Sequence, residues 1–204
     1  MGNITPTKGN LIATKKSNVL SKLGFELMDK KRNILIKELM LVIKSIKDIQ
    51  NEIEKTYSEA YSYLQMANVT LGIFEKTSND IPVDDSLKIS YRSIMGVEIP
   101  VVSLDVPREN EICYDFYSSN SFLDETYKKF CKVKSLTAKL AELESSVYRL
   151  TNSIVKTQKR ANALRNIIIP KFNDSIKYIS DSLEEKEREE FSRLKVIKKK
   201  KNDK

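Results

Sequence analysis

Two long segments of this chain repeat their apolar residues every three and four positions, and a shorter segment with a different pattern separates them. A repeat near 3.5 residues places a narrow apolar stripe on a helix, and a second helix is what buries such a stripe. The stripe of the first segment is Leu35, Leu39, Val42, Ile46, Ile49, Ile53, Tyr57, Ala60, Leu64, Ala67 and Leu71. The stripe of the second segment is Leu136, Leu140, Leu143, Val147, Leu150 and Ile154, continuing through Thr157, Ala161, Leu164 and Ile168. The sequence therefore predicts an all-α-dominated fold, a long antiparallel two-helix coiled coil of the N- and C-terminal arms.

Stop and start signals divide the chain into four predicted parts of one elongated domain, residues 1–204. These are a first coiled-coil helix at 7–76, a turn and β-hairpin region at 77–120, a second coiled-coil helix at 121–197 and a basic tail at 198–204. Thr5 and Pro6 suit the N-cap and first position of the first helix, and Ser121 with Asp124 resembles a capping box. Pro170 lies inside the second helix, where the missing N–H is expected to bend it.

The central region changes its apolar period from 3.5 to two residues, which is typical of β-strands. We expect strands at 88–94 and 98–104, joined through Met95 and Gly96, since Gly96 can supply the positive φ of a tight hairpin turn. Pro100 and Pro107 restrict these strands to an edge or a ribbon. An isolated hairpin is only marginally stable, so this one is expected to pack on the coiled coil or on a partner.

The composition excludes most catalytic chemistry. The chain has no His, its five Gly are too far apart for a phosphate-binding loop, and Cys113 and Cys131 do not form a C-x-x-C pair. We therefore expect no catalytic, cofactor-binding or metal site, and we expect two reduced, buried thiols. The longest apolar run, residues 39–43, is far shorter than the roughly 20 residues of a membrane span, and the start lacks a signal sequence. These features predict a cytoplasmic protein without membrane insertion.

A net charge of +8 comes largely from lysines near both termini, which an antiparallel hairpin brings to one end. Nucleic acid or an anionic membrane could bind such an end, although lysine runs without interleaved aromatic residues favour a solvated surface. The acidic run at 184–190 is interpreted as an exposed helix face with the i,i+4 pairs Glu184–Arg188 and Glu189–Arg193. A structural coiled-coil tether and a basic nucleic-acid-binding rod are the alternatives that the residues alone leave open.

Four segments resemble a known family. Residues 160–170 (R-A-N-A-L-R-N-I-I-I-P) closely resemble the "R-x-N-A-L-E-x-x-x-I-P" block of the D subunit of V-type and archaeal A-type rotary ATPases. Ile176, Ile179 and residues 183–195 are similar to its "I-x-x-x-L-E-E-x-E-R-E…R-L-K" tail. Residues 6–11 with 29–35, and residues 94–100, resemble its N-terminal elements and its "v-M-G-V-x-x-P" hairpin. Arg165 replaces a usual Glu, Asn33 a usual Asp, and Met28-Asp29 a usual Leu-Lys, which puts particular salt bridges in doubt.

The resemblance implies a central rotor axle (central stalk) that transmits torque between ATP hydrolysis or synthesis in an A/B hexamer and proton or sodium transport through a membrane ring. The implied partners are the F subunit, the A/B hexamer and the funnel-like C/d-type subunit above the membrane ring, in a cytoplasmic V1/A1 sector peripheral to the membrane. No nucleotide or other cofactor is expected on the chain itself. The ring-facing terminal end is expected to carry soluble charge rather than a large apolar patch.

Candidate site residues follow from this reading and fall into three sets. Expected contacts with the A/B ring are Leu11, Lys15, Lys22, Arg160, Arg165, Pro170 and Arg188. Expected coiled-coil seam residues are Leu39, Val42, Ile46, Ile49, Ile53, Leu140, Leu143, Val147, Leu150 and Ile154. Expected partner contacts in the hairpin, outside the core of the axle, are Ile94, Met95, Gly96, Val97 and Pro100.

Overall fold

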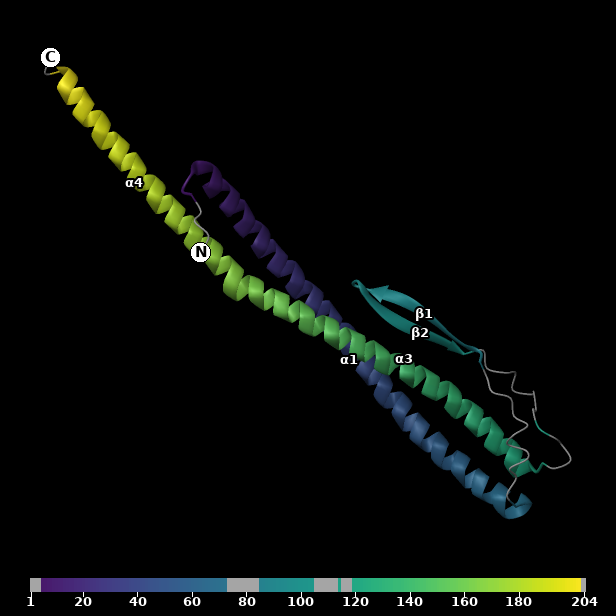
Figure 1. Cartoon of the computed structure of the whole chain (residues 1–204). Coiled ribbons are helices and arrows are strands. Elements are labelled where there is room, and N and C mark those ends of the chain that lie inside the picture. Colours follow the sequence, from purple (N-terminus) through teal and green to yellow (C-terminus); the bar gives the residue numbers. More distant parts are fainter. Residues whose placement is uncertain (1–4, 73–84, 105–113, 115–118, 203–204) are drawn as a thin grey trace. The chain divides into compact units, whose positions relative to one another are not determined.

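The structure, a computed structural model, describes residues 5–72, 85–104, 114 and 119–202. Its elements are α1 (Lys8–Leu71), β1 (Leu87–Ile94), β2 (Val97–Leu104), α3 (Ser121–Ala163), the π-helical turn η2 (Leu164–Ile168) and α4 (Ile169–Asn202) (Figure 1). The predicted fold class, long helices with a two-stranded antiparallel hairpin between them, is confirmed. Among the described helices, none has an apolar stretch long enough to cross a bilayer.

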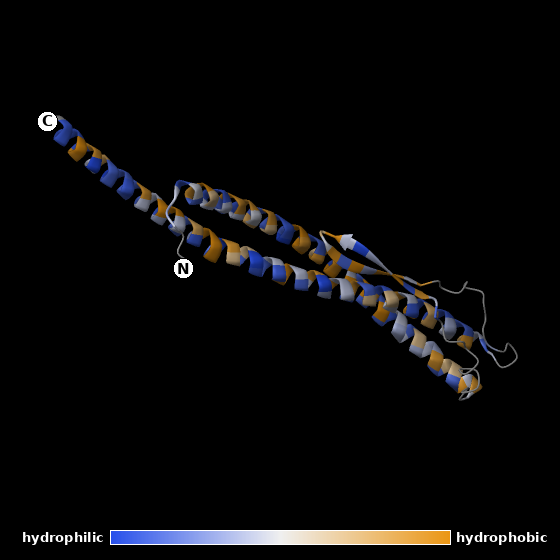
Figure 2. Ribbon diagram, turned by 45° about the horizontal axis from the view of Figure 1, so that its top comes forward, coloured by the Kyte–Doolittle hydropathy of each residue, from blue (hydrophilic) through white to orange (hydrophobic). Residues whose placement is uncertain are grey.

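The chain packs as two units. The terminal unit combines Met1–Asn33 with Val155–Lys204, and the central unit is Ile34–Ile154. Apolar and polar residues alternate along the helices of each unit, as Figure 2 shows by colour. Such alternation is what an amphipathic helix requires if one side is to pack and the other to meet water.

The ends of α1 differ from the prediction for local reasons. Thr7, not Thr5, caps the helix, because the Asn10 N–H donates to Thr7 Oγ1 at 3.2 Å. At the other end α1 stops at Leu71 rather than residue 76, since Gly72 has φ +74° and its N–H donates to the Asn68 carbonyl at 3.0 Å. Glycine is favoured at this left-handed position after a helix. The turn predicted at 77–82 lies outside the described residues.

The start and the end of the second helical arm also differ from the predictions. Ser121 is its first helical residue, and the Asn120 carbonyl accepts the first backbone hydrogen bonds. Asp124 does not complete a capping box; its carboxylate accepts from the Tyr114 hydroxyl at 2.5 Å, and burial together with this bond raises the pKa of Tyr114. The helix continues to Asn202, so the boundary predicted at 197 is wrong and Lys198–Lys201 are helical.

The hairpin pairs β1 with β2 in one continuous antiparallel register from Leu87↔Leu104 to Ile94↔Val97. Gly96 has the predicted positive φ, 74°, and Met95 also lies in the left-handed region with φ 52°. Two successive positive φ values belong to the type I′ turn, whose twist matches that of the strands it joins. The conformation of Met95 was not foreseen, because a residue other than Gly, Asn or Asp is uncommon there.

The core of the central unit joins the hairpin to the helices. Leu35 and Leu150 are fully buried and pack with Val97 and Ile99 from β2. Leu39, Val42, Ile94 and Ile154 surround this cluster. The expectation that the hairpin lies outside the core is therefore wrong for Val97 and Ile99. A hairpin too small to be stable alone gains its stability from this apolar contact.

The outer edge of β2 is held against α3. The Val102 N–H donates to Glu142 Oε2 at 2.9 Å, and Arg149 Nη1 donates to the Glu98 carbonyl at 3.1 Å. The Arg149 guanidinium also lies 5.2 Å from the centroid of the Tyr91 ring, within the range of a cation–π contact. The hairpin is thus fixed along α3 by polar contacts as well as by its apolar face.

Leu35→Ala tests the core of the central unit. Removing a fully buried leucine side chain should lower the free energy of unfolding by about 2–5 kcal/mol. Leu41→Ala, on the exposed side of the same helix, is the matched control and should change it by less than about 0.5 kcal/mol. Urea unfolding followed by far-UV circular dichroism measures both, and equal losses would show that Leu35 is not a core position.

Candidate functional site

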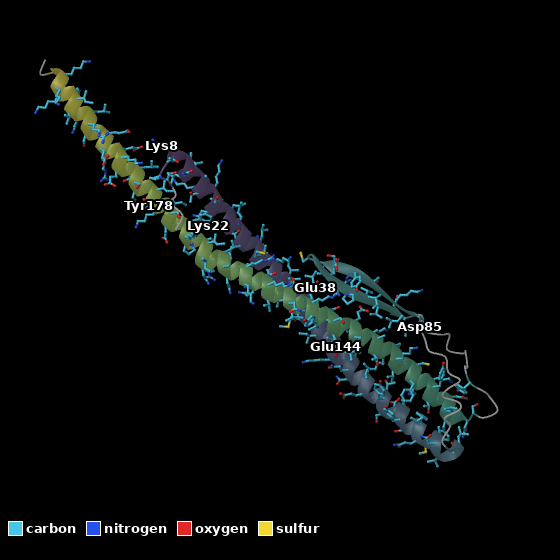
Figure 3. The ribbon with its side chains drawn as sticks, viewed as in Figure 1. Lys8, Lys22, Glu38, Asp85, Glu144 and Tyr178 are labelled. Atoms are coloured by element: carbon cyan, nitrogen blue, oxygen red, sulfur yellow. The ribbon has the colours of Figure 1, made fainter. Side chains whose placement is uncertain are left out.

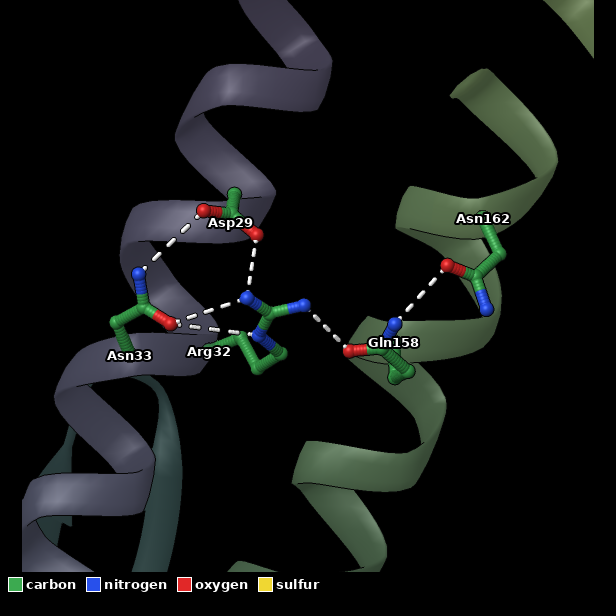
Figure 4. Close-up of polar contacts among 5 residues, drawn as sticks. All are labelled: Asp29, Arg32, Asn33, Gln158 and Asn162. Carbon is green, nitrogen blue, oxygen red and sulfur yellow. Dashed lines mark hydrogen bonds and ion pairs between the residues drawn. The ribbon is translucent and has the colours of Figure 1, made fainter. Parts of the chain in front are cut away.

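A polar network connects the two helical arms of the terminal unit (Figure 4). Arg32 donates from Nη1 to Gln158 Oε1 at 2.7 Å and pairs through Nη2 with Asp29 Oδ1 at 2.7 Å. Asn33 Oδ1 accepts from the Arg32 guanidinium at 3.1 Å, and Gln158 Nε2 donates to Asn162 Oδ1 at 2.9 Å. The planar Arg32 guanidinium thus contacts residues of both arms through several N–H donors held at fixed angles. A lysine ammonium lacks this planar geometry and could not make all of these contacts together.

A second polar pair lies nearer the chain termini. Asn18 Nδ2 donates to Asn173 Oδ1 at 2.8 Å, and Asn18 is buried, with an exposed fraction of 8%. The buried Asn18 Oδ1 accepts no hydrogen bond from the described residues. A buried asparagine in a coiled-coil seam lowers stability but favours the one register in which it finds its partner. Together with Arg32–Gln158, this pair opposes sliding of one arm along the other.

The predicted bend at Pro170 takes the form of a π-helical turn. Residues Leu164–Ile168 form this turn, and the Ile169 N–H donates to the Leu164 carbonyl. Pro170 has no backbone N–H to donate, and in an α-helix its ring would crowd the carbonyl of Asn166, four residues earlier. The wider π-helical turn just before Pro170 relieves that contact. A π turn adds one residue, which accounts for the altered apolar spacing after Ile168. Leu164 lies over Gly24 of α1, where a Cβ atom would be 3.9 Å from Leu164 Cδ1.

The residues expected to meet the A/B ring lie on the surface of the terminal unit, with one exception. Leu11 is half-buried; the exposed ones are Lys15, Lys22, Arg160, Arg165, Pro170 and Arg188. Figure 3 labels Lys22 on α1 and Tyr178 on α4. The predicted pairs Arg188–Glu184 and Arg193–Glu189 are present at 3.7 and 4.0 Å. Lys8 pairs with Glu187 across the two arms at 2.9 Å, and this contact raises the pKa of Lys8.

The terminal unit also exposes many large apolar side chains, which contradicts the expectation that its surface would be charged rather than apolar. Five of them on α1 fall within about 100° of one helix face at 100° per residue. They are Ile12, Val19, Leu20, Leu23 and Leu27. On α4 the exposed apolar residues include Phe191, Leu194 and Ile197, where the helix projects beyond the start of α1 (Figure 1). Exposed apolar stripes of this length mark surfaces that bind another protein.

The predicted seam residues all lie in the central unit and are at least half-buried, with Leu150 fully buried. In the hairpin, Val97 and Pro100 are buried, Ile94 is half-buried, and Met95 and Gly96 are exposed at the turn. Cys131 is half-buried and not in a disulfide, whereas Cys113 lies outside the described residues. No group of three or more metal-ligating side chains gathers within the described segments.

Comparison with known proteins identifies a family for this chain. The chain matches the family of ATP synthase D subunits over residues 10–199. It belongs to this family. The V-type ATP synthase D subunit of Thermotoga neapolitana is 44% identical over 200 residues, covering 97% of this chain and 98% of that protein. The A-type ATP synthase D subunits of Pyrococcus furiosus and Thermococcus sibiricus are 36% and 34% identical, each covering 96% of this chain and 93% of the relative.

Within this D subunit, the polar network unites two of the segments on which the resemblance rests. Asp29, Arg32 and Asn33 belong to the first, and Asn162 to the second. The contact of Arg32 with Gln158 was not predicted, because nothing in the sequence pairs positions so far apart. Asn18 could have been found, since Leu11, Asn18 and Phe25 follow one heptad position.

A double-mutant cycle tests the network. Arg32→Ala and Gln158→Ala should each destabilise the chain, and their effects should be non-additive by about 0.5–1.5 kcal/mol, the usual net value of one hydrogen bond. Lys30, exposed on the opposite side of α1, provides the control cycle with Gln158, where the effects should add. Thermal unfolding measures both cycles. Additivity of the Arg32 and Gln158 effects would show that the contact contributes nothing to stability.

Proposed function

We propose that this member of the D subunit family is the central rotor axle of a V-type/A-type rotary ATPase. It transmits torque between ATP hydrolysis or synthesis in the A/B hexamer and proton or sodium transport through the membrane ring. The observation that carries the proposal is the terminal unit: two arms locked together by Arg32–Gln158 and Asn18–Asn173, with apolar stripes that face outward. The two helical arms of an axle must not slide along each other, and the outer surface of the axle must fit the partner that surrounds it.

The terminal unit is the part proposed to enter the A/B ring. The exposed face of α1 from Ile12 to Leu27 and the projecting end of α4 provide apolar contact area, and Lys15, Lys22, Arg160 and Arg165 provide positive charge beside it. Exposed charge pairs contribute only about 0–1 kcal/mol each, so these contacts can exchange as the axle turns. The π turn before Pro170 makes the two arms unlike each other, which supplies the asymmetry that a rotor needs to act on successive sites.

The central unit is proposed to bind the F subunit and to lead to the C/d-type subunit above the membrane ring, with the hairpin as one contact. The chain itself is proposed to be non-catalytic, to bind no nucleotide, nucleic acid or other cofactor, and to lie at the membrane only through its complex. The absence of His and of a glycine-rich phosphate loop from the sequence supports this reading.

Cross-linking tests the orientation of the axle. With Cys113 and Cys131 replaced by serine, single cysteines at Val19 and Leu23, both exposed, should form disulfides with cysteines introduced on the inner surface of the A/B ring under dilute oxidant. Val69→Cys, exposed near the other end of α1, is the matched control and should not react with the ring. Reaction at Val69 without reaction at Val19 and Leu23 would mean that the opposite end enters the ring.

ATP turnover tests the non-catalytic assignment. The purified full chain should release no phosphate from ATP above the buffer rate, because it lacks a nucleotide-binding loop. Adding the chain to an A/B complex prepared without it should restore sustained turnover by that complex. Phosphate release by the chain alone, retained through repeated purification, would refute the assignment.

A further inference from the structure

The hairpin has two backbone edges, and the register defines both. A two-residue turn makes Ile94 and Val97 a hydrogen-bonded pair, so every second residue of each strand turns its N–H and C=O away from the partner strand. The outward residues of β1 are Leu87, Ile89, Tyr91 and Ser93. Those of β2 are Glu98, Pro100, Val102 and Leu104. Each edge therefore offers a row of backbone donors and acceptors.

The edge of β2 is occupied within the chain. Glu142 accepts from the Val102 N–H, Arg149 donates to the Glu98 carbonyl, and Pro100 has no N–H to satisfy. Figure 1 shows β2 on the side of the hairpin toward α3, with β1 on the far side. Pro100 does not weaken the ladder, because its pair with Tyr91 is a non-hydrogen-bonded one in which the backbone nitrogen of Pro100 points away from β1.

The edge of β1 differs from that of β2. In the part of the chain that the structure describes, no residue hydrogen-bonds to the outward backbone groups of Leu87, Ile89, Tyr91 or Ser93. All residues of β1 are exposed except Ile94, which is half-buried. An eight-residue strand with one unpaired edge is a ready template for another strand. The contrast with the covered edge of β2 indicates that the open edge serves a partner.

The side chains of β1 indicate which residues a third strand at this edge would need. Leu87, Ile89 and Tyr91 form an exposed apolar row on one face, and Arg92 is exposed and positively charged on the other. Cross-strand neighbours on one face stabilise a sheet when they are both apolar or oppositely charged. The complementary strand therefore has apolar residues on the first face and an acidic residue opposite Arg92 on the second.

We propose that β1 binds an extended segment of a neighbouring subunit, with apolar residues on one face and an acidic residue on the other, by adding it as a third strand at this edge. The proposal rests on the proposed function, in that the hairpin contacts another subunit, and adds the mode of contact. A second copy of this chain is a poorer occupant, because antiparallel pairing of β1 with itself in full overlap would place Arg92 opposite the like-charged Lys88.

Residue-resolved hydrogen exchange on the full chain, alone and in the assembled ATPase, tests this mode directly. In the isolated chain, the amides of Ser90 and Arg92 should exchange slowly and those of Ile89 and Tyr91 rapidly, because only the former pair with β2. In the complex, exchange at Ile89 and Tyr91 should slow by about tenfold or more, as new backbone hydrogen bonds form. Rapid exchange at both residues in the complex would overturn the proposal. Slowing that appears in the isolated chain as its concentration rises would assign the edge to a second copy and overturn it as well.

A proline substitution provides an independent measurement. Ile89→Pro removes one outward N–H, as Pro100 already does on β2, and Ile89→Val keeps that N–H as the matched control. The proline variant should bind the rest of the complex about threefold to tenfold more weakly than the valine variant, the effect of one lost hydrogen bond. Equal binding, with Ser90 and Arg92 still protected from exchange, would contradict strand addition. If Ser90 and Arg92 lose their protection in the proline variant, the hairpin itself has been disrupted. Hydrogen exchange at Ile89 and Tyr91 of the unsubstituted chain then decides whether a third strand is added.

The two proposals fail in different ways. Ring cross-links from Val19 and Leu23 together with rapid exchange at Ile89 would refute strand addition and leave the axle assignment intact. A chain that neither joins the complex nor reacts with the A/B ring would refute the axle assignment itself.

Discussion

Each long helix of this chain has an apolar stripe too narrow to form a core by itself, and the rest of the structure depends on this constraint. A lone helix with such a stripe would leave Leu35, Leu150 and Ile179 in water, whereas each is fully buried. A narrow seam, however, offers little to distinguish one alignment of two helices from another. A smooth apolar contact between two helices tolerates sliding by one heptad, about two turns, because similar side chains meet again there.

Polar contacts supply the missing alignment. Asn18–Asn173 and Arg32–Gln158 in the terminal unit each have one best register, and a slip would separate both pairs and leave the buried Asn18 amide without its partner. In the central unit, Val97 and Ile99 of the hairpin pack beside Leu35 and Leu150, while Arg149 and Glu142 hold the backbone of β2. Register thus depends on a few specific contacts, while the seam provides most of the burial. The proposed transmission of torque would require both.

The sequence predicted what periodicity controls and missed what depends on contacts between distant residues. The two arms, the hairpin and the positive φ of Gly96 follow from local patterns, and the structure has them. The end of α1 at Leu71 was missed because Gly72 takes a left-handed conformation that the periodic pattern does not reveal. The π turn before Pro170 was predicted only as a bend, since spacing alone does not distinguish a kink from one added residue.

The candidate site was predicted less fully than the fold. The cationic side chains Lys15, Lys22, Arg160 and Arg165 could be proposed because charge is visible in a sequence, and all four are exposed. The exposed apolar face of α1 at Ile12–Leu27 was not predicted, since both sides of a helix can look apolar when its partner is unknown. Only the structure separates the side that packs in the seam from the side that remains exposed.

The central claim is that this chain turns inside the A/B ring, and rotation is the direct measurement. The ring is fixed to a surface, and a bead is attached to a single cysteine at Val69, which is exposed in the central unit. On addition of ATP the account predicts continuous rotation of the bead in one direction, at a rate that follows ATP concentration. Sustained ATP hydrolysis by the same molecules, with a bead that only fluctuates about a fixed angle, would contradict it.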